Sequence, residues 1–307
     1  KLHTPTFLTV SGTYHGLPVA SVMRLQMLAG RLQKYVTRTL RGQRPVWKYS
    51  FKAHLDRERQ VTLTADEIAA PSMSIGRILT CAWHLDARQV FHVPYPYVPS
   101  SELLQIPIDT RTNVVTFMGR LEVRKGVLDL AMAIPLVLRE HPDAVFRFIG
   151  STEHSHLRNI DMRSHLQTSL AGLGSSVEFI DHVDQTLLAE KLSETDICVF
   201  PSIWENFANV CLESMSAGRG VVASESGGMA EMLNGGEFGL TVPPRNHRRL
   251  AQAICQLLSH PEQRMALGRA SRERILTEYS VDRIGLLQEE SYRRAIAARK
   301  SRGARAV

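Results

Sequence analysis

Short runs of β-branched and aromatic residues alternate with longer stretches of mixed polarity from residue 113 onward. Such runs, when glycine, proline or serine closes them, are typical of buried strands. The pattern predicts strands near residues 113–118, 144–150, 177–180, 196–200, 220–223 and 239–242. It predicts helices near residues 126–140, 157–172, 185–193, 207–217, 246–258, 261–276 and 282–299. The alternation indicates an α/β protein with a parallel sheet and helices on both of its faces.

Two glutamates lie eight positions apart just after the predicted strand 196–200, beyond a Pro-Ser break. Inside one helix, Glu205 and Glu213 would be separated by roughly 12 Å of rise and would face different directions. We therefore expect Glu205 in the loop at the carboxyl end of the strand and Glu213 on the second turn of the next helix. The first backbone N–H groups of that helix can bind an anion. By itself, such a pair of glutamates is usually a solvated helix face.

Cations and glycines follow two other predicted strands. Arg120 and Lys125 come after strand 113–118 at the opening of a helix, where two cations can neutralise a diphosphate without a metal. The helix dipole disfavours cations at this position unless an anion is bound. Gly227 and Gly228 follow strand 220–223 and predict a close backbone approach to a ligand. All three groups fall at strand ends, where α/β sheets bind ligands.

Taken together and in this order, these motifs resemble the family-four (group 1) retaining glycosyltransferases of GT-B fold. The matching motifs are Gly119-Arg120-Leu121 before Lys125-Gly126, Pro201-Ser202 before Glu205-Asn206-Phe207 and Glu213, and Gly227-Gly228 before Glu231. The resemblance covers residues 113 to about 278. It implies two Rossmann-like domains that face each other across a cleft.

The resemblance also implies roles for individual residues. The expected catalytic residues are Glu205 and His3. Glu205 would lie near the donor sugar, orient it and stabilise positive charge at the anomeric carbon. His3 would face the reaction centre from the acceptor domain, although a lone histidine is more often structural. Glu213 would accept hydrogen bonds from the ribose hydroxyls of the donor. The residues expected to bind the donor are Gly119, Arg120, Lys125, Phe207, Ala208, Asn209, Val210 and Glu213.

The predicted domain organisation has three parts. Residues 1–106 form a partial acceptor-side domain with its linker, residues 107–280 form the nucleotide-sugar-binding domain, and residues 281–307 form a carboxy-terminal helix and basic tail. The proline-rich segment Phe91–Pro107 is expected to be a stiff linker between the domains. Only about 105 residues precede the end of the linker, so we expect a truncated amino-terminal domain; a minimal natural variant is the alternative. Ala65–Ser72 is expected to be the last strand of that domain. The final helix is expected to pack toward it.

Composition and charge narrow the class of protein. With 44% hydrophobic and 22% charged residues, the chain is typical of a soluble globular protein, and no apolar run suggests a transmembrane helix. Four scattered cysteines suggest a reducing cytoplasm. The net charge of +7 is concentrated in residues 1–110, which carry 13 basic against 7 acidic side chains. There, Val19–Arg44 reads as a basic amphipathic helix, either with a solvated cationic face or in contact with an anionic membrane or a lipid diphosphate.

The expected function follows from the resemblance. It is retaining transfer of a sugar from a nucleotide diphosphate sugar to a saccharide or lipid-linked acceptor, in polysaccharide or glycolipid synthesis. No Asp-x-Asp metal signature occurs, so we expect Arg120, Lys125 and helix dipoles to take the place of a metal. We also expect no cofactor and no nucleic-acid partner. We expect a cytoplasmic protein, with peripheral contact at the inner membrane face left open. A non-catalytic sugar-nucleotide-binding protein, an inactive fragment, and an epimerase or hydrolase on a related fold remain alternatives.

Overall fold

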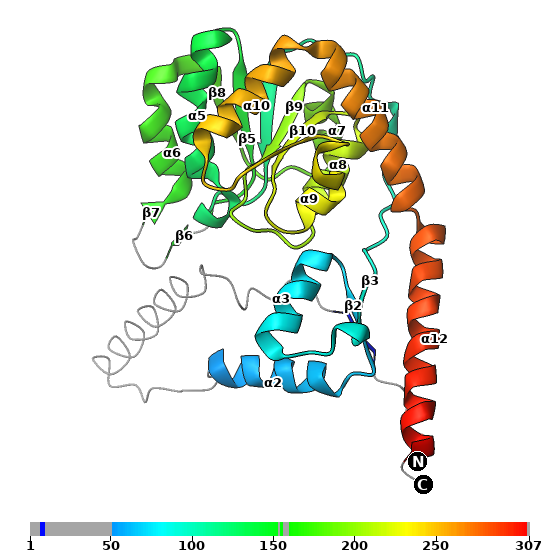
Figure 1. Cartoon of the computed structure of the whole chain (residues 1–307). Helices are drawn as coiled ribbons and strands as arrows, with labels where there is room; N and C mark the ends of the chain where they lie inside the picture. Colours follow the sequence, from blue (N-terminus) through cyan, green and yellow to red (C-terminus); the bar gives the residue numbers. More distant parts are fainter. Residues whose placement is uncertain (1–6, 10–50, 153, 156–159, 306–307) are drawn as a thin grey trace, which may run out of the picture. The chain divides into compact units, whose positions relative to one another are not determined.

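The computed structural model describes residues 7–9, 51–152, 154–155 and 160–305 (Figure 1). Two compact units divide the chain: unit 1 comprises residues 1–94, 155–159 and 286–307, and unit 2 comprises residues 95–154 and 160–285. This division follows contacts within the chain, and the domain limits predicted at residues 106 and 280 stay predictions. His3 and the basic helix predicted over Val19–Arg44 lie outside the described residues.

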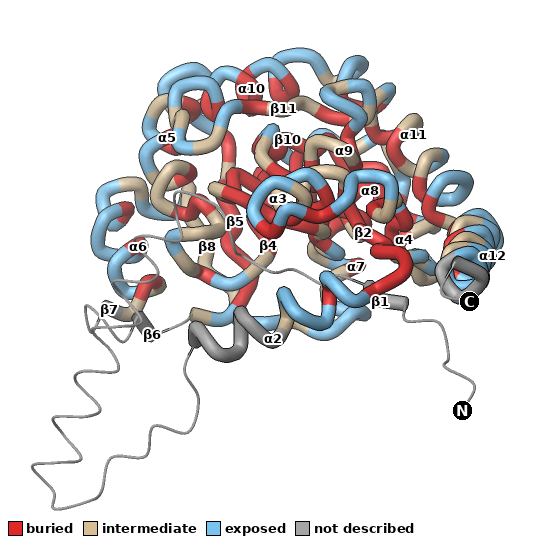
Figure 2. The backbone as a smooth tube through the Cα atoms, turned by 60° about the horizontal axis from the view of Figure 1, so that its bottom comes forward, coloured by how far each residue is buried: buried red, intermediate tan, exposed pale blue. Residues whose placement is uncertain are grey.

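Unit 1 contains a small parallel sheet. Its described strands are β1 (Phe7–Thr9), β2 (Glu67–Ala70) and β3 (Val90–His92), in the order β1-β2-β3. Its described helices are α2 (Phe51–Thr64), α3 (Met73–Trp83) and the part of α12 (Val281–Arg305) that follows Gly285. Strand β2 is buried along its whole length (Figure 2). The prediction that this strand is the last one of the unit is wrong, because β3 follows it. Strand β3 was missed because it is short and leads directly into prolines.

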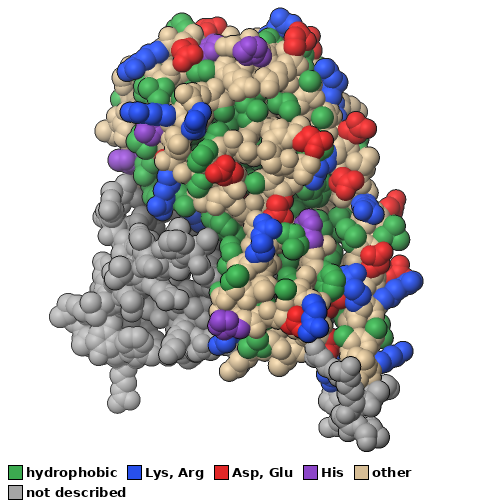
Figure 3. Space-filling view, in the orientation of Figure 1, with side chains coloured by type: hydrophobic (Ala, Val, Ile, Leu, Met, Phe, Trp, Pro, Cys, Tyr) green, Lys and Arg blue, Asp and Glu red, His purple; other side chains and the backbone are tan. Residues whose placement is uncertain are grey.

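Helix α12 is fixed to strand β2 by a buried carboxylate. Glu67, which is 1% exposed, accepts hydrogen bonds from the Ser291 hydroxyl and from Nε (3.0 Å) and Nη2 (2.9 Å) of Arg294. The Arg294 guanidinium also lies 3.9 Å from the centre of the Phe91 ring. These contacts confirm the prediction that the final helix packs against the amino-terminal part of the chain. Along its visible face, basic and acidic side chains are interspersed (Figure 3).

Unit 2 contains a parallel sheet of six described strands. They are β4 (Val114–Met118), β5 (Val145–Ile149), β8 (Val177–Ile180), β9 (Ile197–Phe200), β10 (Gly220–Ser224) and β11 (Leu240–Val242). Their order is β11-β10-β9-β4-β5-β8, and the six predicted strands are confirmed. The chain leaves β4 toward β5 and β8, then returns to β9 on the opposite side. The loops after β4 and β9 therefore diverge at a topological switch point, where α/β sheets bind ligands.

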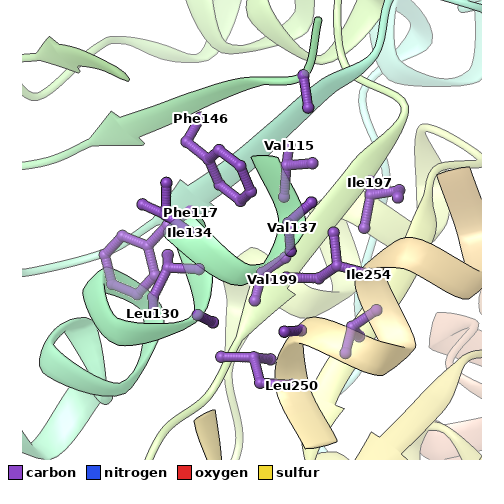
Figure 4. Close-up of a cluster of buried hydrophobic side chains, with 14 of the residues drawn as sticks. Val115, Phe117, Leu130, Ile134, Val137, Phe146, Ile197, Val199, Leu250 and Ile254 are labelled. Atoms are coloured by element: carbon purple, nitrogen blue, oxygen red, sulfur yellow. The ribbon is translucent and has the colours of Figure 1, made fainter. Parts of the chain in front are cut away.

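Successive residues of the central strands pack into two separate cores, one on each face of the sheet. Phe117, Ile197 and Val199 belong to the first core, where they pack with residues of α5 (Val127–Glu140) and α10 (His247–Ser259) (Figure 4). Helix α6 (Met162–Leu170) also contributes to this core. Met118, Cys198 and Phe200 belong to the second core. The second core includes residues of α4 (Ser101–Gln105), α7 (Gln185–Ser193), α8 (Asn209–Ser216), α9 (Gly228–Met232) and α11 (Pro261–Glu278). This two-sided burial explains the nearly continuous apolar runs in the sequence.

Several predicted boundaries shift. The helix predicted from residue 207 begins at Asn209, and the helix predicted over 157–172 begins at Met162, where the Asp161 side chain accepts a hydrogen bond from Ser164 N at 3.2 Å. Two short strands, β6 (His154–Ser155) and β7 (Ile160–Asp161), precede that helix. The segment Phe91–Pro107, predicted as a stiff linker, includes the end of β3 and helix α4. Helix α4 forms because Ser100 caps it and Leu103 is buried.

Three partly or fully buried arginines hold the segment that leads into β4. Arg219, only 1% exposed, donates to the carbonyl oxygens of Ala217, Thr195 and Pro107. Arg264 donates to the carbonyls of Leu257 and Thr110, and Arg272 donates to those of Ser216, Leu104 and Ile106. Burial lowers the pKa of Arg219 to about 10. We call Arg219, Arg264 and Arg272 the arginine clamp. It fixes residues 104–110 through the backbone carbonyls of Leu104, Ile106, Pro107 and Thr110 and through the Thr110 hydroxyl.

Candidate active site

Three loops at the carboxyl ends of neighbouring strands meet at Glu205. The loop after β4 is tied to the loop after β9 by a hydrogen bond from Ile203 N to the Arg124 carbonyl oxygen, 2.8 Å long. The loop after β10 joins them, because Gly228 N donates to the Glu205 carbonyl oxygen at 2.8 Å and Gly227 pairs with Glu205. The structure thus brings together the motifs that are far apart in the sequence.

Glycine is required at two of these crossings. Gly126 has φ +74°, and a Cβ atom there would lie 1.9 Å from the Pro201 carbonyl oxygen. Gly227 has φ +88°, and its Cβ would lie 2.1 Å from the Glu205 carbonyl oxygen. The left-handed backbone disfavours a side chain at both positions, and the close approach to a backbone carbonyl leaves no room for one. Gly227 was predicted to approach a ligand; in the structure it approaches the backbone of Glu205.

Cations surround the Glu205 carboxylate, whose side chain is 11% exposed. Lys125 Nζ forms a salt bridge with Glu205 Oε2, and Arg124 Nη1 lies 3.0 Å from the same oxygen. Arg124 Nη2 lies 2.7 Å from Glu122 Oε1, and Arg120 Nη2 lies 3.3 Å from that oxygen. We call these five residues, which alternate in sign from Arg120 through Glu122, Arg124 and Glu205 to Lys125, the charge chain. Sequence analysis missed Glu122 and Arg124, although both lie between two residues that it selected.

Helix α8 begins beside this cluster and carries the remaining predicted donor residues. Ala208 is the N-cap residue of this helix, and Asn209 and Val210 lie in its first turn. In the described structure, no side chain caps that turn. The positive end of the helix dipole and its backbone N–H groups therefore lie close to the loop that carries Glu205. Glu213 lies on the second turn, as predicted, and burial raises its pKa.

The aromatic ring of Phe207 is part of the packing. Its centroid lies 5.2 Å from that of Tyr95 in an edge-on arrangement and 6.1 Å from that of Tyr279. Burial, and next the charge of Glu213, raise the pKa of the nearby Tyr97 phenol. The aromatic side chains thus anchor the loop before α8, which leaves the backbone of Phe207 as its candidate ligand-binding part.

Two of the predicted donor-binding residues, Gly119 and Arg120, pair with residues other than Glu205 in the described structure. Gly119 N donates to the Ile149 carbonyl oxygen at 3.0 Å, so this N–H is used within the sheet end. The Arg120 side chain is 48% exposed and pairs with Glu122. Among the described residues, no group of three or more His, Cys, Asp or Glu side chains could hold a metal ion. Within the same residues, no helix has the length and apolar character needed to cross a membrane.

The fold defines an α/β protein with parallel sheets, as predicted. Residues 112–260, just under half of the chain, match the family described as glycosyl transferases group 1. The match includes β4 through α10 and therefore all three loops that meet at Glu205.

Several curated proteins are also similar in sequence to this chain. The glycogen synthase of Mycobacterium tuberculosis is 30% identical over 176 residues, 57% of this chain and 41% of that protein. The spore coat protein SA of Bacillus subtilis is 32% identical over 174 residues, 56% of this chain and 46% of that protein. The α-maltose-1-phosphate synthase of Mycolicibacterium smegmatis is 30% identical over 213 residues, 66% of this chain and 54% of that protein. The chain thus spans about half the length of these relatives.

Solved structures that resemble the chain are GT-B glycosyltransferases. Sucrose-phosphate synthase from Thermosynechococcus elongatus has a TM-score of 0.65 at 26% identity, and the match covers 80% of this chain and 62% of that one. Anabaena HepE in complex with UDP-glucose also has a TM-score of 0.65, at 16% identity over 90% of this chain and 84% of that one. The second likeness bears on the fold alone. The predicted fold class is confirmed.

Proposed function

We propose that the protein transfers a sugar from a nucleotide diphosphate sugar to an acceptor hydroxyl, with retention of anomeric configuration and without a metal. One observation carries the proposal: three strand-end loops meet at Glu205, with Lys125 and Arg124 on its carboxylate and the start of α8 close by. The match of residues 112–260 to the group 1 glycosyltransferases supports the reaction class.

Each part of the site has a chemical task in this proposal. Lys125 and Arg120 neutralise the diphosphate, and the first N–H groups of α8 donate hydrogen bonds to its oxygens. Glu213 accepts hydrogen bonds from the ribose hydroxyls, which replace the solvent that this half-buried carboxylate lacks. Glu205 lies near the sugar and stabilises positive charge at the anomeric carbon.

The transfer step needs no covalent enzyme intermediate. The bond between the anomeric carbon and the diphosphate oxygen breaks, and the acceptor oxygen bonds to that carbon on the same face. The acceptor proton moves to the departing diphosphate oxygen. The cations neutralise charge that grows on the leaving group, so they bind the transition state more tightly than the bound donor. His3 remains a candidate for the acceptor side of the reaction.

The names of the relatives guide the choice of substrates. The Anabaena HepE structures are complexes with UDP and with UDP-glucose, so UDP is the first nucleotide to test. Glycogen synthase and α-maltose-1-phosphate synthase suggest a saccharide acceptor. We propose a saccharide or lipid-linked acceptor and a cytoplasmic location; contact with an anionic membrane through Val19–Arg44 is part of the lipid-linked alternative.

Calorimetry with UDP, GDP and ADP in EDTA tests donor binding. Lys125→Ala should weaken binding of the diphosphate by about 1.5–3 kcal/mol, the range for hydrogen bonds to charged groups, and should leave binding of the nucleoside unchanged. Arg139→Ala removes an exposed cation from the other end of α5 and serves as the control. Equal losses for diphosphate and nucleoside, or a strict requirement for Mg²⁺ or Mn²⁺, would contradict the proposed metal-free site.

A transfer assay separates an enzyme from a binding protein. Incubation of the chain with UDP-glucose and a panel of saccharide and lipid-linked acceptors should release UDP and give a product with the donor's anomeric configuration, read by NMR. Binding without transfer would favour the non-catalytic sugar-nucleotide-binding protein. An inverted product would refute the retaining mechanism.

A further inference from the structure

The charge chain gives Lys125 two roles that compete. Lys125 forms a salt bridge with Glu205, yet the proposed function requires the same ammonium group to bind the donor diphosphate. Both side chains are largely buried, at 16% and 11% exposure. A carboxylate that loses its cation in such surroundings is strongly destabilised unless another partner holds it. Glu205 therefore needs a second cation that stays in place.

Arg124 has the geometry of that second cation. Its Nη1 atom lies 3.0 Å from Glu205 Oε2, the oxygen that Lys125 also contacts. Its Nη2 atom lies 2.7 Å from Glu122 Oε1, so the two ends of the guanidinium hold two different carboxylates. The planar fork of arginine suits this bridging position, and lysine offers only a single point of charge.

The backbone of Arg124 is fixed to the loop that carries Glu205. Its carbonyl oxygen accepts the hydrogen bond from Ile203 N at 2.8 Å, and Nη1 lies 3.4 Å from the Trp204 carbonyl oxygen. Its side chain is 13% exposed. Arg120, in contrast, reaches Glu122 and is 48% exposed. Within the charge chain, Arg124 is thus the cation that is fixed to the Glu205 loop by its backbone.

We propose that Arg124 is a positioning residue that retains the Glu205 carboxylate when Lys125 leaves it for the donor diphosphate. This inference rests on the proposed function, because it assumes that Lys125 binds the diphosphate. Without Arg124, Lys125 is the one cation of the charge chain that still pairs with Glu205, and Glu205 competes harder with the diphosphate for its ammonium group. Arg124 therefore strengthens diphosphate binding by way of Glu205.

A double-mutant cycle on UDP affinity tests this role. UDP lacks the sugar, so Glu205 acts in this assay only as a competitor for Lys125. Glu205→Gln should tighten UDP binding about threefold, and Arg124→Gln should weaken it about tenfold, on the scale of one charged hydrogen bond. In the Glu205→Gln background, Arg124→Gln should change affinity less than about twofold. Arg139→Gln, which removes an exposed cation of α5, should have no effect in either background.

The outcomes of the cycle are distinct. If Arg124 acted only by its charge, Arg124→Gln would weaken UDP binding equally in both backgrounds, and the inference would be overturned. Arg124→Lys keeps the charge without the fork and should fall between wild type and Arg124→Gln; thermal unfolding verifies that each variant is folded. If the wild-type chain bound none of UDP, GDP and ADP, the proposed function would fail first, and this inference with it.

Discussion

The substitution Gly126→Ala tests whether the loop after β4 is seated as the structure has it. Gly126 separates Lys125 from helix α5 and crosses the backbone of Pro201. A Cβ atom there would lie 1.9 Å from the carbonyl oxygen and 2.6 Å from the carbonyl carbon of Pro201. Both are backbone atoms, so no side-chain rotation can relieve the overlap.

The expected loss of stability is the sum of two costs. A left-handed conformation costs a residue with a Cβ about 1–2 kcal/mol. Moving the loops apart also breaks the 2.8 Å hydrogen bond from Ile203 N to the Arg124 carbonyl, worth about 1 kcal/mol, and loosens the packing around it. We expect Gly126→Ala to lower the free energy of unfolding by about 3 kcal/mol.

Two other glycines separate these costs in urea unfolding experiments. Gly235 has φ +65°, and a Cβ atom added there would meet no atom within 4 Å, so Gly235→Ala should show the conformational cost alone. Gly172 has neither a left-handed φ nor a neighbour within 4 Å, and Gly172→Ala should be nearly neutral. UDP binding should fall only in Gly126→Ala. Similar losses of stability for Gly126→Ala and Gly235→Ala would refute the reasoning from backbone overlap.

Three further predictions concern single side chains. In the transfer assay, Glu205→Gln should lower kcat about 100-fold or more with a smaller change in donor KM, because the Glu205 carboxylate stabilises positive charge that exists at the anomeric carbon only during the reaction. An unchanged kcat would exclude a catalytic role for Glu205. Burial raises the pKa of Glu213, so the folded state favours its protonated form, and Glu213→Gln should raise the unfolding temperature at pH 7 and have the wild-type unfolding temperature near pH 4. The same variant should raise the donor KM. A lower unfolding temperature of Glu213→Gln at pH 7 would contradict the expected direction of the effect. Arg219→Met should cost about 3 kcal/mol in urea unfolding, since three carbonyls lose a donor, whereas the exposed Arg139→Met should cost under about 0.5 kcal/mol; equal costs would refute the clamp.

The strands of unit 2 could be predicted because burial on both faces leaves a strong signal in the sequence. Ile197 and Cys198 face different cores, and both are apolar. Helix starts were harder to predict, because caps decide them. Ala208 is the N-cap of α8 and makes no side-chain capping hydrogen bond, whereas Asp161 is the N-cap of α6 and makes one. The five-residue helices α4 and α9 were not predicted, because a helix of so few turns depends on tertiary contacts more than on its own periodicity.

The loops of the candidate site could be predicted, and their mutual contacts could not. Glu205 was selected as a catalytic residue and Lys125 as a donor-binding residue, but nothing local to either indicates a salt bridge across 80 positions of sequence. Arg124 and Glu122 look like ordinary surface charges until β4 and β9 become neighbours and bring Glu205 beside them. The two close backbone crossings of Gly126 and Gly227 likewise depend on sheet order, which the strand pattern alone leaves open.

The arginine clamp has a consequence for how this protein can vary through evolution. Its hydrogen-bond acceptors on residues 104–107 are backbone carbonyls, and every residue type supplies one. The side chains at Leu104 and Pro107 can therefore change without loss of these hydrogen bonds, whereas no other side chain reproduces the reach and five donors of arginine at Arg219 or Arg272. Among homologues, we expect drift in the held segment opposite fixed arginines, so covariation between the two would be weak despite direct contact.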